Sequence, residues 1–152
     1  MISQLTLTPL LERAGTLFPQ TEIISRRPDD CAGNASGDSP GSSSGNSPGN
    51  SPGNSTHRYT YRDMYVRTRA RSAALQRMGL RPGDRVATLM WNHHAHLEAY
   101  FGVPVIGGVL HTLNLRLHPD ELAYIVNHAG DRFLIVDDVL LPVYETFASK
   151  VK

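Results

Sequence analysis

Lysine and cysteine are the scarcest chemically versatile residues of this 152-residue sequence. The only lysines are Lys150 and Lys152, so the body of the chain has no ammonium group for a Schiff base or a phosphate contact. A single cysteine, Cys31, excludes an internal disulfide and is typical of a reducing compartment. We therefore expect a cytoplasmic protein, although an organelle lumen would satisfy the same pattern.

Long apolar runs are also missing. The longest, residues 101–110, contains one proline and three glycines and reaches only about half of a membrane span. Residues 1–15 have no basic segment followed by an apolar core, so they do not resemble a secretory signal. We expect a soluble protein with no transmembrane segment.

The net charge of +1 leaves the whole chain without polyelectrolyte character. The charge is uneven, because residues 58–85 carry eight arginines and only two aspartates. These arginines surround a helix that must also bury an apolar stripe, and long arginine stems commonly flank such a stripe. A nucleic-acid-binding role is therefore not expected.

Residues 28–57 form a low-complexity insert rich in glycine, serine, proline and asparagine. The unit Ser-Pro-Gly-Asn occurs in tandem at residues 47–50 and 51–54, a period too short for a solenoid. Few apolar side chains offset the entropy cost of ordering, so we predict a disordered surface loop. A phosphate-binding loop would need a lysine and a helix start directly after its glycines, and neither follows.

The segments on either side of the insert predict a paired hairpin. Residues 1–20 have the periodicity of a helix, and residues 21–25 and 58–61 read as strands that pair across the insert. The expected inner stripe of the first helix is Leu7, Leu10, Leu11, Ala14 and Leu17.

A second helix is predicted after the hairpin. Thr60 and Asp63 have the spacing of a capping box that opens it, and Gly79 closes it. Its arginines at positions 67, 69, 71 and 77 are expected to face mostly away from the core. The expected inner stripe is Tyr61, Met64, Tyr65, Thr68, Ser72 and Leu75.

Strands and helices alternate from Arg85 onward. The predicted strands are residues 85–90, 109–113 and 132–136, and the predicted helices are 93–106, 119–128 and 141–152. Asn92 would cap the first of these helices, Pro104 would kink or shorten it, and Val143, Tyr144 and Phe147 would face inward from the last. This order predicts an α/β fold with a parallel sheet covered on both faces, as in a partial doubly wound sheet. Three strands rarely complete such a domain, so we expect further chain after Lys152.

Ligands of open α/β sheets bind beyond the carboxyl ends of the strands, where three segments are candidates. In residues 91–96, His93 and His96 are too few for a closed metal site, so a capped helix start with partly buried histidines is expected. Residues 111–116 are the second candidate. The pair Asp137 and Asp138 could hold Mg²⁺, but we expect solvated acids that cap the last helix. The residues alone assign no catalytic, cofactor-binding or metal-binding role.

Several separate segments, in the same order, resemble the adenylate-forming superfamily and within it the bacterial medium- and long-chain fatty-acid–CoA ligases. They are residues 83–87 (GDRVA), 92–100 (NHHAHLEAY), 110–117 (LHTLNLRL) and 123–129 (AYIVNHA), and the opening helix and strand of residues 1–27 are also similar. Leu115 departs from the family pattern, which typically has proline there.

The resemblance implies the first subdomain of a large AMP-binding domain. Residues 1–27 would supply its opening helix and strand, residues 28–57 an insert, and residues 58–152 a truncated α/β part. The implied reaction joins a fatty acid to CoA through an acyl-adenylate, with ATP, Mg²⁺ and CoA needed by the full-length enzyme. None of these is expected to bind this segment, because the family's phosphate loop and catalytic lysine come later in the chain.

The resemblance therefore implies a scaffold role, no activity of the segment alone, and a contribution to a homodimer surface. Two alternatives stay open. One is a fragment of an aryl-CoA ligase or another adenylate-forming enzyme. The other is a non-enzymatic remnant that acts as an interaction module through its unfinished sheet.

Overall fold

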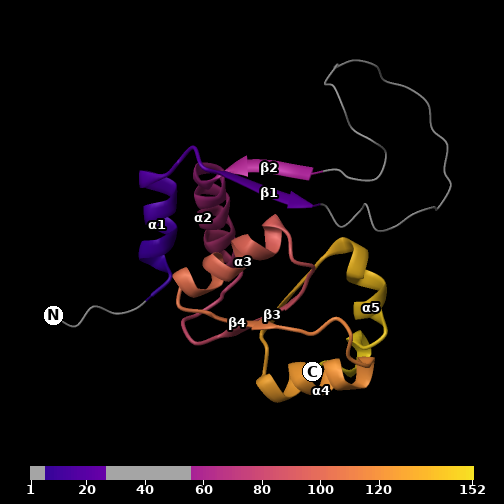
Figure 1. Ribbon diagram of the computed structural model, residues 1–152. Helices are drawn as coiled ribbons and strands as arrows, with labels where there is room; N and C mark the ends of the chain where they lie inside the picture. The colour runs from indigo at the N-terminus through magenta and orange to yellow at the C-terminus, as the bar shows by residue number, and fades with distance from the viewer. Residues whose placement is uncertain (1–5, 27–55) are drawn as a thin grey trace.

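The computed structural model of the protein describes residues 6–26 and 56–152 (Figure 1). The expectation of a disordered loop over residues 28–57 lies outside the described residues, apart from Thr56 and His57. These two residues belong to a strand, so the ordered part after the insert begins two residues earlier than predicted.

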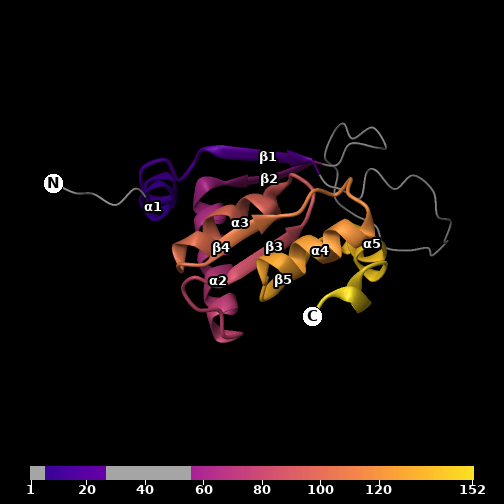
Figure 2. The ribbon, with the colours of Figure 1, turned by 90° about the horizontal axis from the view of Figure 1, so that it is seen from below.

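A helix and a two-stranded ribbon form the first part of the fold. Helix α1 spans Thr8–Leu17, and strand β1 (Glu22–Arg26) pairs antiparallel with β2 (Thr56–Thr60), with Ile24 opposite Arg58. The predicted pairing across the insert is therefore confirmed. In Figures 1 and 2 the ribbon lies over α2 and α3 and is separate from the main sheet.

The predicted inner stripe of α1 is wrong for three of its leucines. Leu11 is buried, whereas Leu7, Leu10 and Leu17 are exposed. The cause is Gly15, which packs so closely on α2 that a Cβ there would lie 2.6 Å from the Cβ of Tyr65. The narrow glycine side of the helix therefore faces α2, and the leucine-rich side is turned toward solvent.

Helix α2 (Tyr61–Arg77) begins at the predicted capping box. Thr60 Oγ1 accepts a hydrogen bond from the Asp63 N–H at 3.2 Å, and the Asp63 carboxylate accepts one from the Thr60 N–H at 2.9 Å. After the helix, Gly79 has a φ of +95°, which glycine adopts without the steric cost of a side chain. The fully buried members of the predicted stripe are Met64, Thr68, Ser72 and Leu75.

The main sheet has three parallel strands in the order β4-β3-β5, as the alternation of elements predicts. Strand β3 (Arg85–Leu89) is central, and Val86 to Leu89 are completely buried. Strands β4 (Val109–Thr112) and β5 (Phe133–Val136) are partly exposed. The two edge strands are less buried than β3 because each has a neighbouring strand on one side only.

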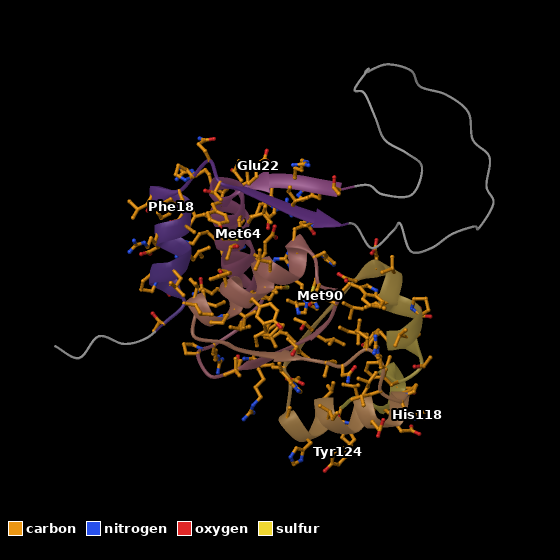
Figure 3. All side chains as sticks on the ribbon, in the orientation of Figure 1. Phe18, Glu22, Met64, Met90, His118 and Tyr124 are labelled. Carbon is orange, nitrogen blue, oxygen red and sulfur yellow. The ribbon has the colours of Figure 1, made fainter. Side chains whose placement is uncertain are left out.

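Helices cover both faces of the sheet (Figure 2). Helices α2 and α3 (His94–Val105) pack on one face around Leu75, Val86 and Val103. Helix α4 (Pro119–Ala129) packs on the other through Leu122 and Val126. Tyr124 lies on the outer side of α4, points away from the sheet and is exposed (Figure 3). The doubly wound arrangement is thereby confirmed.

The predicted last helix is broken into three short pieces. They are the 3₁₀ helix η2 (Asp138–Leu140), helix α5 (Leu141–Glu145) and the 3₁₀ helix η3 (Ala148–Lys150). The side-chain amide of Asn127 on α4 binds the backbone of Lys150 and Lys152 at 2.8 and 2.9 Å, and this holds the chain against α4. Phe147 is fully buried, as predicted.

Pro104 stands in the last turn of α3, which ends one residue before the predicted end. Gly107 follows with a φ of +81°. Within residues 6–26 and 56–152, no helix combines the length and apolar character that a membrane crossing requires.

Candidate functional site

The strand order β4-β3-β5 creates a topological switch beside the first strand of the sheet. The chain leaves β3 on one face to reach β4, then returns across the other face to β5 on the opposite side of β3. At the carboxyl ends of β3 and β5 the two loops therefore diverge, and in open α/β sheets this is where ligands bind. Residues 90–93 and 137–140 meet at this point.

Asp137 joins these two loops. Its Oδ2 accepts hydrogen bonds from the Trp91 backbone N–H at 2.7 Å and from His93 Nε2 at 2.8 Å. The side chains of His93 and Asp137 are only 5% and 7% exposed. The expectation of a solvated acid is therefore wrong for Asp137. It holds for Asp138, which is exposed and bonds the Val139 N–H.

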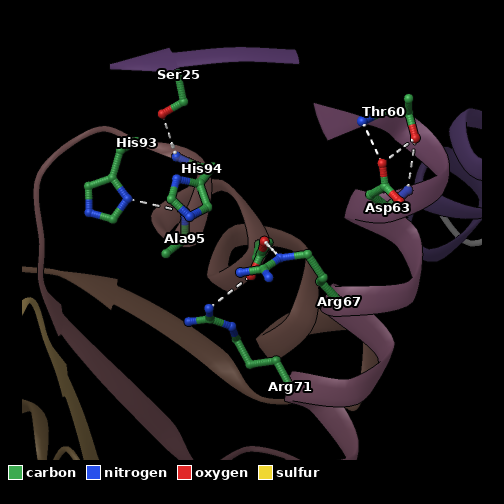
Figure 4. Close-up of polar contacts among 9 residues, drawn as sticks. Ser25, Thr60, Asp63, Arg67, Arg71, His93, His94 and Ala95 are labelled. Carbon is green, nitrogen blue, oxygen red and sulfur yellow. Dashed lines mark hydrogen bonds and ion pairs between the residues drawn. The ribbon is translucent and has the colours of Figure 1, made fainter. Parts of the chain in front are cut away.

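His93, and not Asn92, caps helix α3. Its Nδ1 accepts a hydrogen bond from the Ala95 N–H at 3.1 Å, so this nitrogen carries no proton (Figure 4). The proton is then on Nε2, which donates to Asp137. The contact with Asp137 thus fixes both the ring orientation and the tautomer that the cap needs.

His96 lies deeper and does not share a ligand-binding position with His93. Its Nε2 is 3.0 Å from Thr88 Oγ1 on the central strand, and burial lowers its pKa below the ordinary value. His93 and His96 therefore engage separate partners. Across the described segments, no group of three or more His, Cys, Asp or Glu residues is arranged to hold a metal ion.

A hollow of about 440 Å³ opens at the carboxyl edge of the sheet. Trp91, Asn92 and Tyr100 form one wall, residues 112–116 form the second, and Leu140 and Val143 close the third. His111 does not reach it, because its Nδ1 lies 2.7 Å from Asp131 Oδ2, just before β5. Residues 112–116 therefore line this hollow, whereas His111 is directed toward Asp131 at the opposite end of the sheet.

Sequence reasoning missed a buried ion cluster between α2 and α3. Glu98 is 1% exposed and accepts hydrogen bonds from Arg67 Nε at 2.5 Å and from Arg71 Nη2 at 2.9 Å (Figure 4). The expectation that Arg67 and Arg71 face away is therefore wrong. The available signal was Glu98 itself, the only charged residue in the otherwise apolar run of α3.

The AMP-binding enzyme family profile matches residues 46–151 of this chain. The chain belongs to the AMP-binding enzyme family.

Within this family, the chain is 41% identical over 152 residues to a long-chain-fatty-acid–CoA ligase of Thermus thermophilus, covering all of this chain and 24% of that protein. It is 57% identical over 67 residues to a 3-methylmercaptopropionyl-CoA ligase of Ruegeria pomeroyi, covering 44% of this chain and 12% of that protein. The chain therefore spans about a quarter or less of the length of these relatives.

A solved AMP-binding enzyme shows the same fold. The anthranilate CoA ligase AuaEII, in complex with anthranoyl-AMP, aligns with a TM-score of 0.60 and 26% identity, over 62% of this chain and 18% of that one. The predicted α/β class and the resemblance to adenylate-forming CoA ligases are both confirmed.

The acids at the carboxyl edge of the sheet do not fit Mg²⁺. Asp137 is buried and already accepts two hydrogen bonds, and the Asp138 carboxylate is turned to its own loop. The hollow offers polar side chains, but the described residues around it contain no lysine and no nucleophile paired with a base. The Asp137 contacts therefore fix the loop that forms one side of the hollow.

Proposed function

We propose that this chain is the amino-terminal part of an ATP-dependent fatty-acid–CoA ligase. The observation that carries the proposal is the similarity to the Thermus thermophilus ligase along all 152 residues. In the proposed reaction, a carboxylate oxygen of the fatty acid attacks the α-phosphorus of ATP and pyrophosphate leaves. The thiolate of CoA then attacks the acyl carbonyl, and AMP leaves as the thioester forms.

The part that we assign to these residues is structural. Strand β3 is the buried centre of the sheet, and Asp137 ties the loop after β5 to the loop after β3. Preorganised loops at this edge suit a ligand site that is completed by other residues. ATP, Mg²⁺ and CoA are proposed for the complete enzyme and not for residues 1–152 alone.

We also propose that the 152-residue chain does not form an acyl-adenylate by itself. A cation is expected to stabilise the charge that develops on the phosphates during adenylation. Lys150, one of only two lysines, is ion-paired with Asp120 beside α4. The arginines Arg67 and Arg71 are committed to Glu98.

A chimaera tests the proposal directly. The corresponding quarter of the Thermus thermophilus ligase would be replaced by this chain, and pyrophosphate release would be measured with ATP, CoA and palmitate. Activity within about tenfold of the parent ligase is expected, because the sheet and its edge loops would be equivalent. A folded chimaera with no activity would contradict the proposal, and pyrophosphate release by the 152-residue chain alone would contradict its inactivity.

An aryl acid is the second candidate substrate, favoured by the structural similarity to the anthranilate CoA ligase. The complete polypeptide that carries this sequence would be assayed with decanoate, palmitate, 3-methylmercaptopropionate and anthranilate. We expect the highest kcat/KM for one of the two fatty acids. A preference for anthranilate would replace the fatty-acid assignment while leaving the ligase assignment intact.

The homodimer and the cytoplasmic location stay predictions. Light scattering of the purified complete polypeptide tests the first, and fractionation of cells tests the second. The alternative of a non-enzymatic interaction module predicts that the chain alone forms a stable complex with a full-length ligase of the family. Co-elution of the chain with the Thermus thermophilus ligase, together with an inactive chimaera, would favour that alternative over the ligase assignment.

A further inference from the structure

The β1–β2 ribbon meets the rest of the domain at the first residues of helix α3. Ser25 Oγ on β1 accepts a hydrogen bond from the His94 backbone N–H at 2.9 Å (Figure 4). On β2, the ring of His57 lies 4.1 Å from the ring of His94, tilted by 31°. The ring of Tyr59 packs on both, with centroid distances of 5.1 and 5.8 Å.

This ring cluster is built for neutral groups. His57 Nε2, His94 Nδ1 and the Tyr59 hydroxyl are buried and have no hydrogen-bond partner in the part of the chain that the structure describes. An imidazolium at either histidine would present an N–H donor with no acceptor to receive it. It would also place a positive charge against the face of a neighbouring histidine ring.

The charged groups around the cluster do not compensate such a charge. His93 lies next to His94 on α3, with ring centroids 5.4 Å apart. The nearest acid of α3 is Glu98, and the two arginines that α2 directs at it already pair with its carboxylate. On the ribbon, Glu22 is exposed and pairs with Arg58.

The titration of the cluster agrees with its geometry. Burial, reinforced by the positive potential of His57, lowers the pKa of His94 to about 4. Burial and the charge of Glu98 raise the pKa of Tyr59 to about 12. This hydroxyl therefore stays neutral and offers no negative charge to balance a protonated histidine.

We propose that the His57–His94 contact is an acid-sensitive latch, which holds the β1–β2 ribbon on helix α3 when both rings are neutral and releases it when the His94 ring is protonated. The main sheet stays folded in this transition, because its core around Ala87, Leu89 and Leu122 is separate from the cluster around Tyr59 and Met64. Release loosens the Ser25–His94 hydrogen bond and opens a second pocket of about 320 Å³, which Ile23 and Leu97 line.

Hydrogen exchange of the full 152-residue chain tests the latch. Backbone protection would be measured at pH 7.5 and pH 5.0, each corrected for the intrinsic exchange rate. Protection of the β1 and β2 amides is expected to fall on the order of tenfold at pH 5.0, because the open state binds the proton more tightly than the latched state. Protection of the β3 amides is expected to stay constant.

Matched variants identify the responsible ring. His94→Phe keeps a flat ring without a titrating nitrogen and is expected to abolish the pH dependence of ribbon exchange. His128→Phe, at an exposed histidine on α4, is expected to leave it unchanged. If His94→Phe does not fold, His94→Gln makes the same test, because its side-chain amide does not titrate.

Three results would overturn the latch. The first is an equal fall in protection in His94→Phe. The second is an equal fall across β3, which would show global unfolding. The third comes from the wild-type chain alone: the NMR signal of the His94 ring would titrate at a pH different from the midpoint of ribbon opening.

Discussion

His93 Nε2 lies 2.8 Å from Asp137 Oδ2, although the two residues are 44 positions apart in the sequence. The same carboxylate oxygen holds the Trp91 N–H, and the same imidazole caps helix α3 through its other nitrogen. One contact therefore fixes the loop after β3, the start of α3 and the loop after β5. These three segments define the carboxyl edge of the sheet.

Replacement of Asp137 should show how much this contact stabilises the fold. Asp137→Ala leaves the Trp91 N–H and His93 Nε2 buried without an acceptor, so we expect a loss of about 2–3 kcal/mol in the free energy of unfolding. Urea denaturation followed by circular dichroism measures it. Asp138→Ala is the matched control and should cost less than about 1 kcal/mol. Equal losses for the two variants would contradict a special role of Asp137.

The buried Glu98 should be essential to the packing of α2 on α3. Glu98→Gln removes the charge that Arg67 and Arg71 neutralise, and the expected cost is about 2 kcal/mol, below the value for a fully buried pair because both arginines retain contact with water. Thermal and urea unfolding would measure it, with Glu145→Gln at an exposed position as the control. A Glu98→Gln protein as stable as the control would show that the cluster gives no net stabilisation.

A side chain at Gly15 should destabilise the packing of α1 on α2. Alanine improves helix propensity by roughly 1 kcal/mol over glycine, but the new Cβ would lie 2.6 Å from Tyr65 Cβ and force α1 away from α2. We expect Gly15→Ala to destabilise the protein by about 1–3 kcal/mol, since overpacking outweighs the gain. The neighbouring exposed change Thr16→Ala should be nearly neutral. A more stable Gly15→Ala protein would mean that the two helices can separate without loss.

The capping box of α2 should be visible in the titration of Asp63. Hydrogen bonds from the side chain and backbone of Thr60 lower the pKa of Asp63. A carboxylate whose pKa is lower in the folded state stabilises the fold above its ordinary pKa, and this stabilisation is lost as the pH falls through the folded value. Thr60→Val removes the hydroxyl, so the pKa of Asp63 is expected to rise toward the ordinary value.

Carboxylate NMR titration checks this expectation, and Asp84 provides an internal control. The pKa of Asp84 is also lowered, mainly by the Arg81 backbone N–H, and this contact is remote from Thr60. The pKa of Asp84 should therefore stay constant in Thr60→Val. An unchanged pKa of Asp63 would show that the backbone hydrogen bond alone sets it.

Elements governed by local chemistry could be predicted from the sequence. The Thr60–Asp63 cap, the helix end at Gly79 and the alternation after Arg85 depend on neighbours a few residues away. The pairing of β1 with β2 was predictable because two short segments with the β-branched and aromatic residues typical of strands flank a segment with few apolar side chains. These features express intrinsic preferences that the tertiary structure leaves in place.

Features governed by distant contacts could not be predicted. Asp137 and Asp138 are identical neighbours in the sequence, and only the register of β3 with β5 carries the first toward Trp91. The same register holds His93 in the capping position that Asn92 could equally have filled. On α1, the leucine stripe suggested the inner face, but the close approach allowed by Gly15 decided the orientation.

The central position of β3 also sets the order in which the strands of the sheet can pair during synthesis. Val86 pairs with Leu110, 24 residues later, and with Phe133, 47 residues later, so β3 emerges before either partner and its β5 edge is filled last. At synthesis rates of about 5–20 residues per second, roughly 2–10 s pass before β5 can join it. During that interval the most buried strand of the described residues can pair only with β4, and its β5 edge stays open to solvent or to other chains.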